Sequence, residues 1–167
     1  MPTHRLLLIR HAKAAHAATD RERPLTASGA RAAAAIGAWL QTSGYVPDQV
    51  LVSTALRAQQ TWAAAAEVLG ADREPTLDER IYDNTVEALL DVIGEAPDEV
   101  TTLAVVGHNP SIGELAANLD DGEGDDAARR ALQAGFPTGA VAVFQAASFG
   151  DLPPGGATLV DFAVPAP

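Results

Sequence analysis

The most informative segment of the chain is Leu6-Leu7-Leu8-Ile9-Arg10-His11-Ala12. Its first four residues form a short, continuous apolar run, which is typical of a buried strand covered on both faces by helices. Arg10 and His11 follow at the end of this run, so the strand is expected to place a permanent cation beside an imidazole. An arginine next to a histidine suits the binding of a phosphate group and its attack by a nucleophile.

Two further apolar runs are followed by groups of the same kind. Val50-Leu51-Val52-Ser53 is followed by Arg57, and the run that ends at Gly107 is followed at once by His108. Each group alone also fits an ordinary role: a capping residue for His11, a solvated helix residue for Arg57 and a strand-to-helix turn for His108. The joint pattern favours a shared site, because independent structural features would rarely place matching groups after three strands.

Strands and helices alternate along the sequence. The expected strands are Leu6–Arg10, Val50–Ser53, Thr102–Gly107, Ala140–Gln145 and Thr158–Val164. The expected helices run from Thr26 or Ser28 to Leu40, from Thr54 to Leu69, from Thr85 to Gly94 and from Pro110 to Leu119. This alternation predicts one α/β domain over residues 1–167, a three-layer α/β/α sandwich with a mostly parallel central sheet. In such sheets ligands bind beyond the carboxyl ends of the strands, where both histidines are expected.

The composition excludes several classes of function. The chain has 167 residues, 47% hydrophobic residues and a net charge of -11, so a globular protein that binds no nucleic acid is expected. Cysteine is absent, and the apolar runs are too short for a bilayer span or a secretory signal, so we expect a cytoplasmic protein without a membrane partner. The acidic run over residues 120–126 is interpreted as a solvated loop, in which Asp125 and Asp126 favour the start of a helix.

Arg10, His11, Arg57 and His108 form a coherent set for phosphoryl transfer. The two arginines can each bind a phosphoryl group with two hydrogen bonds, and both stay charged at neutral pH. A neutral imidazole can attack phosphorus, and a second, protonated imidazole would stabilise charge on the equatorial oxygens. A zinc site built from the two histidines and carboxylates is disfavoured, because Arg10 would place a cation where the metal ion would sit.

These residues resemble the signature of the histidine phosphatase superfamily, which has the phosphoglycerate mutase-like fold. The matching motifs are Arg10-His11-Ala12, then Ser53-Thr54-Ala55-Leu56-Arg57-Ala58-Gln59-Gln60-Thr61 as Ser-x-x-x-Arg-x-x-x-Thr, and Gly107-His108. A further segment is similar to the Asp-x-x-Arg-Pro-Leu-Thr-x-x-Gly pattern of small bacterial phosphohistidine phosphatases of the SixA type: Asp20-Arg21-Glu22-Arg23-Pro24-Leu25-Thr26-Ala27-Ser28-Gly29.

The resemblance implies that His11 is the nucleophile that becomes phosphorylated, while Arg10, Arg57 and His108 form the phosphate pocket. It implies no metal and no organic cofactor. The expected partner is a phosphorylated protein that carries phosphohistidine, because so short a chain leaves little room for a lid over small metabolites. Two alternatives stay open: hydrolysis of a small phosphate ester, and a phosphate-binding regulatory module without turnover.

The choice of proton donor stays open between two carboxylates. An ester leaves as an alkoxide unless an acid protonates it. The segment from Leu77 to Tyr82 resembles the one that carries this acid in the mutases, which puts Glu79 at the acid position. Glu79 is equally interpreted as an exposed loop carboxylate, and Asp20 could instead approach the pocket from the loop after the first strand. Lys13, on the same loop, is interpreted either as an extra phosphate contact or as a solvated lysine.

Overall fold

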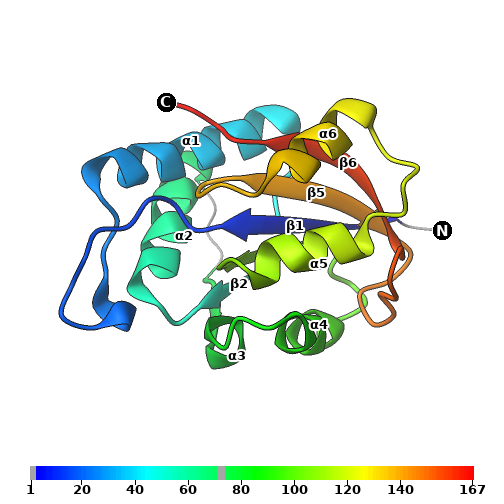
Figure 1. Cartoon of the computed structure of the whole chain (residues 1–167), viewed down its shortest axis with the longest axis horizontal. Helices are drawn as coiled ribbons and strands as arrows, with labels where there is room; N and C mark the ends of the chain where they lie inside the picture. The colour runs from blue at the N-terminus through cyan, green and yellow to red at the C-terminus, as the bar shows by residue number, and fades with distance from the viewer. Residues whose placement is uncertain (1–2, 71–73) are drawn as a thin grey trace.

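The computed structural model describes residues 3–70 and 74–167, and within them six strands form one sheet (Figure 1). The strands are β1 (His4–Arg10), β2 (Gln49–Ser53), β3 (Thr76–Asp78), β4 (Thr102–Gly107), β5 (Val141–Ala146) and β6 (Ala157–Ala163). Their order across the sheet is β3-β2-β4-β1-β5-β6. Neighbours among β1 to β4 pair in parallel, and β5 pairs antiparallel with both β1 and β6. The predicted mostly parallel sheet is therefore confirmed.

Helices cover both faces of this sheet, which confirms the three-layer sandwich (Figure 1). The helices of the two layers are α1 (Ala27–Ser43) and α2 (Leu56–Leu69) on one face, and α4 (Val86–Gly94), α5 (Ser111–Leu119) and α6 (Asp126–Ala134) on the other. Successive side chains of a strand point to opposite faces. Leu7 and Ile9 of β1 accordingly join the α1/α2 core, while Leu6 and Leu8 join the core on the other face. The apolar run of β1 thus fills both cores.

Helix α1 shows the ends that its sequence predicts. The hydroxyl of Thr26 accepts a hydrogen bond from the backbone N–H of Gly29 at 2.9 Å, and Gly44 ends the helix with a φ of 78°. Within α1, Gly37 lies directly against α2, because a Cβ at this position would lie 2.2 Å from the carbonyl oxygen of Ala65. The small residues of both helices therefore allow a close approach of their backbones.

Four elements next to the site differ from the expectation. Strand β3 and the short helix α3 (Glu79–Tyr82) occupy a stretch that shows no apolar run, because β3 is a three-residue edge strand with exposed side chains. Helix α2 begins at Leu56 and not at Thr54, so the turn after β2 stays outside the helix. Helix α5 begins at Ser111, with Pro110 at its N-cap.

The acidic segment after α5 folds back on the protein. Asp120 forms an ion pair with Arg129 at 3.0 Å, and the side chain of Asp125 accepts a hydrogen bond from Ala128 at the start of α6. This confirms the helix start expected there. No helix in the described part of the chain is long and apolar enough to cross a membrane.

Candidate active site

The predicted phosphate-binding groups meet at the carboxyl ends of the parallel strands. Arg10 is in register with Gly107 on the neighbouring strand β4, and the N–H of His11 donates to the carbonyl of Gly107 at 3.0 Å. This pairing brings the two residues that follow the strands together. The rings of His11 and His108 lie with their centroids 5.2 Å apart.

His11 is held as a neutral imidazole with a free ring nitrogen. Its side chain is buried, with 8% of the residue exposed, and its Nδ1 lies 2.7 Å from the carbonyl oxygen of Ala12. A carbonyl only accepts, so Nδ1 carries the hydrogen and Nε2 keeps its lone pair. Burial, together with the positive charges of Arg57 and Arg10, lowers the pKa of His11 to about 4 against the opposing effect of the Ala12 hydrogen bond. Nε2 is therefore available as a nucleophile at neutral pH.

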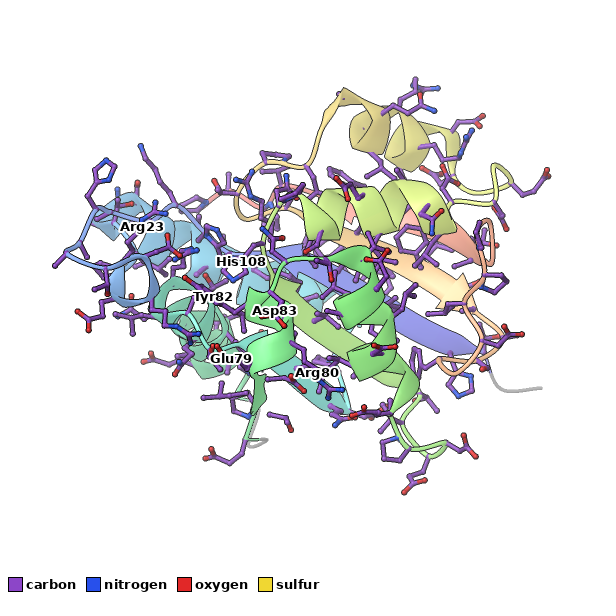
Figure 2. All side chains as sticks on the ribbon, turned by 60° about the horizontal axis from the view of Figure 1, so that its bottom comes forward. Arg23, Glu79, Arg80, Tyr82, Asp83 and His108 are labelled. Atoms are coloured by element: carbon purple, nitrogen blue, oxygen red, sulfur yellow. The ribbon has the colours of Figure 1, made fainter. Side chains whose placement is uncertain are left out.

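Burial also favours the neutral form of His108 in the protein without substrate, and the protonated imidazole expected in the transition state stays a prediction. Burial lowers its pKa to about 3, with further contributions from His11 and Arg57. Its Nε2 lies 2.8 Å from the hydroxyl of Ser53, whereas Nδ1 is buried with no hydrogen-bond partner among the described residues. The ring of Tyr82 meets that of His108 edge-on at 5.8 Å, and Figure 2 shows the two side chains next to each other.

Each of the two predicted arginines has an N–H donor without a partner among the described residues. Nη1 of Arg10 donates to the carbonyl of Phe136 at 3.0 Å, and Arg57 donates from Nη1 and Nη2 to the carbonyl and the carboxylate of Asp20 at 2.8 and 3.1 Å. Within the residues that the structure describes, the buried Nε–H of each arginine has no partner. An anion that reaches both side chains would find unpaired, charged donors.

Asp20 lies in this site, but it holds no proton at neutral pH. It begins the one-turn helix η1 (Asp20–Glu22), and its carboxylate accepts from the hydroxyl of Tyr82 at 2.5 Å as well as from Arg57. Arg23 approaches the other carboxylate oxygen at 3.3 Å. The hydrogen bond from Tyr82 is the largest cause that lowers the pKa of Asp20 to about 2, followed by the one from Arg57. This does not support Asp20 as the proton donor.

Glu79 lies at the rim of the site and is an ion-paired anion. Arg21 from η1 donates to both of its carboxylate oxygens, at 3.0 Å for the bond between Nη1 and Oε2, and the hydroxyl of Thr54 donates to Oε2 at 2.9 Å. These two partners, Arg21 first, lower the pKa of Glu79 to about 2. The structure thus supports an exposed carboxylate at this position and gives no support to a protonated acid. The neighbouring Arg80 turns away to ion pairs with Asp78 and Glu95 (Figure 2).

Lys13 is the least engaged of the candidate residues. Its side chain is exposed on the loop after β1, and it has no hydrogen-bond or ion-pair partner in the described part of the chain. The backbone carbonyl of the same residue accepts from the N–H of Thr26, which fixes the loop against the start of α1. A contact between the Lys13 side chain and a phosphate stays a prediction.

Several contacts around the site are not predicted by any sequence motif. Tyr82 reaches Asp20 and His108 from α3, and Phe136 offers its carbonyl to both Arg10 and Asn109, at 3.0 and 2.9 Å. Phe136 follows α6, so the segment after the acidic run also contributes to the site. In the sequence, the one feature that points to Tyr82 is its place in the Leu77–Tyr82 segment, which resembles a segment of the mutases. Across residues 3–70 and 74–167, no group of three His, Cys, Asp or Glu side chains could hold a metal ion.

Comparison with known proteins agrees with this geometry. The model of the histidine phosphatase superfamily (branch 1) matches residues 6–114. An uncharacterized protein of Mycobacterium tuberculosis is 40% identical over 161 residues, covering 94% of this chain and 99% of that protein. The phosphohistidine phosphatase SixA of Escherichia coli is 32% identical over 123 residues, covering 71% of this chain and 75% of that protein.

Solved structures show the same fold along nearly the whole chain. A proposed phosphohistidine phosphatase SixA from Nakamurella multipartitia has a TM-score of 0.85 and 33% identity, covering 99% of this chain and 98% of that one. Phosphoglycerate mutase from Plasmodium falciparum has a TM-score of 0.66 at 15% identity, with 100% of this chain and 94% of that chain covered. This second likeness concerns the fold alone, which is phosphoglycerate mutase-like as predicted.

Proposed function

This chain belongs to the histidine phosphatase superfamily, and we propose that it hydrolyses phosphohistidine carried by a protein, through a phosphorylated His11 intermediate. The family, the SixA relative and the matched structures support phosphatase activity. The substrate class and the roles of individual residues are the proposal.

The observation that carries the proposal is the charge state of the carboxylates around His11. Asp20 is bound to Arg57, and Glu79 is bound to Arg21, so both carboxyl groups near the pocket are anions at neutral pH. An alkyl phosphate needs a general acid, because its leaving group departs as an alkoxide. A phosphorylated imidazole that carries a proton on its other ring nitrogen departs as a neutral imidazole. The site therefore suits a phosphorus–nitrogen bond better than an alkyl ester bond.

The proposed reaction has two steps. Nε2 of His11 attacks phosphorus, the bond between phosphorus and the substrate imidazole breaks, and the electron pair of that bond stays on the departing nitrogen. Arg10 and Arg57 hold the phosphoryl oxygens while charge is redistributed among them. A water molecule then attacks the phosphorus of phospho-His11, which releases inorganic phosphate and one proton and restores the lone pair on Nε2.

The test compares three substrates under the same conditions, with EDTA present: a phosphohistidine-bearing protein, p-nitrophenyl phosphate and an alkyl phosphate. We expect hydrolysis in that order of rate, with the alkyl phosphate slower than the phosphohistidine by about 100-fold or more, as for a reaction that lacks its general acid. His11→Ala should abolish all turnover, and acid quenching should trap labelled phosphate on the wild-type protein but not on this variant.

The other outcomes separate the alternatives. Efficient hydrolysis of the alkyl phosphate, lost in Glu79→Gln, would replace the proposal by a small-molecule phosphomonoesterase in which Glu79 gains a proton when substrate binds. Binding of phosphate or vanadate without labelling of His11 by any substrate would indicate a regulatory module.

A further inference from the structure

The buried hydroxyl of Ser53 is hydrogen-bonded to the imidazole ring of His108. Ser53 ends β2 with 0% exposure, and its hydroxyl oxygen accepts the backbone N–H of Ala55 at 3.2 Å while lying 2.8 Å from Nε2 of His108. The hydroxyl still has its own hydrogen to donate. Among the described residues, Nε2 of His108 is the acceptor within reach, and a buried hydroxyl hydrogen without an acceptor is costly. Donation from Ser53 to Nε2 leaves one group unpaired, the Nδ1–H of His108, whereas the reverse bond would leave two, the hydroxyl hydrogen and the Nδ1 lone pair.

The position of the ring hydrogen of His108 follows from this bond. A neutral imidazole carries one hydrogen, and when Nε2 accepts, that hydrogen lies on Nδ1. Nδ1 is buried and has no partner in the part of the chain that the structure describes. It is an N–H donor that lacks an acceptor, on a ring 5.2 Å from the ring of His11. A phosphoryl group under attack by His11 would bring the missing acceptor oxygen.

We propose that Ser53 is a positioning residue, which holds His108 in the Nδ1–H tautomer so that this imidazole donates to the phosphoryl group that His11 attacks. The inference rests on the proposed function for the identity of the acceptor. The site then contains two imidazoles with opposite roles. His11 offers a lone pair because the Ala12 carbonyl holds its Nδ1–H, whereas His108 offers an N–H because Ser53 occupies its other nitrogen. In the other tautomer, His108 would turn a second lone pair toward the phosphate and repel it.

The first experiment reads the tautomer directly, by nitrogen NMR of labelled histidine in the full-length protein, with the signals of His108 assigned by their loss in His108→Asn. In the wild type we expect a protonated Nδ1 and an unprotonated Nε2. Ser53→Ala should move hydrogen to Nε2, and Ser53→Thr, which keeps the hydroxyl, should restore the wild-type pattern. Ser111→Ala is the matched control, because Ser111 is also fully buried but donates to the backbone carbonyl of His108 at 3.1 Å.

The second experiment measures the rate of His11 phosphorylation by p-nitrophenyl phosphate in a single turnover. Ser53→Ala should lower this rate by about tenfold or more, because a misplaced ring hydrogen removes a transition-state donor. An Nε2–H tautomer in the wild type, an unchanged tautomer in Ser53→Ala, or a changed tautomer with an unchanged rate would each overturn the inference. The NMR measurement needs no turnover, so it tests Ser53 even if the substrate assignment fails.

Discussion

Mild acid should destabilise this protein through its two buried histidines. The pKa of an exposed histidine is 6.5, whereas His11 and His108 have values of about 4 and about 3 in the folded protein. Between the folded and the unfolded pKa values, the unfolded chain binds protons that the folded chain does not. The free energy of unfolding is therefore at its full value above the unfolded pKa and decreases as the pH falls below it. From about pH 7 to about pH 5, each histidine should cost about 2 kcal/mol of unfolding free energy, or about 4 kcal/mol together.

The assay is urea unfolding at several pH values in this range, followed by tryptophan fluorescence, since Trp62 is buried with 2% exposure. His11→Asn and His108→Asn should each remove about half of the pH-dependent loss, and the double variant nearly all of it. The slope with pH is the quantity compared, so a general loss of stability in a variant does not matter. His16→Asn is the control, because His16 is exposed on the loop after β1 and its replacement should leave the slope unchanged. A double variant with the same slope as the wild type would refute the reasoning.

Three substitutions extend these expectations. Arg57→Lys should weaken binding of vanadate by about 10- to 100-fold in a titration, because a lysine cannot reproduce charge-assisted bonds from a planar guanidinium; unchanged affinity would contradict a role in the pocket. Glu79→Gln should leave phosphohistidine hydrolysis within about threefold of the wild type, since Glu79 is bound to Arg21 and holds no proton, and a loss of about 100-fold would show that it acts as the acid. Gly37→Ala should lower the unfolding free energy by about 1 to 3 kcal/mol in urea titrations, because its Cβ would lie 2.2 Å from the carbonyl oxygen of Ala65; a gain in stability would show that the helices separate freely.

The sequence predicts those parts of the fold that depend on the local pattern of apolar and polar residues. The run Leu6–Ile9 is apolar on both faces, and the strand it forms is covered on both faces, with all four side chains fully buried. Strand β3 escaped prediction because Leu77 is 47% exposed and the strand has a single neighbour, so its sequence carries no burial signal. The same holds for the site, where Arg10 ends β1 and His11 follows it directly, so both could be predicted from the local sequence.

The protonation states around the site could not be predicted from the sequence. They depend on contacts between residues far apart along the chain: Arg57 lies 37 residues from Asp20, Arg21 lies 58 residues from Glu79, and Tyr82 lies 62 residues from Asp20. No motif encodes these distances in space. The same holds for the neutral state of His108, which results from its burial beside other basic groups.

The carboxylate of Asp20 has a consequence for how readily phosphate leaves. Two donors of Arg57 are already engaged by Asp20, so under the proposed function a phosphoryl group would meet the free Nε–H of this guanidinium and share its charge with a carboxylate. Tyr82 and Arg23 also contact that carboxylate and hold it beside Arg57. A cation shared with a carboxylate binds a second anion less tightly than an unoccupied one, so this contact would weaken the binding of substrate and of inorganic phosphate alike. Under the proposed function, the Asp20 carboxylate would therefore lower the affinity of the pocket for phosphate and favour its release.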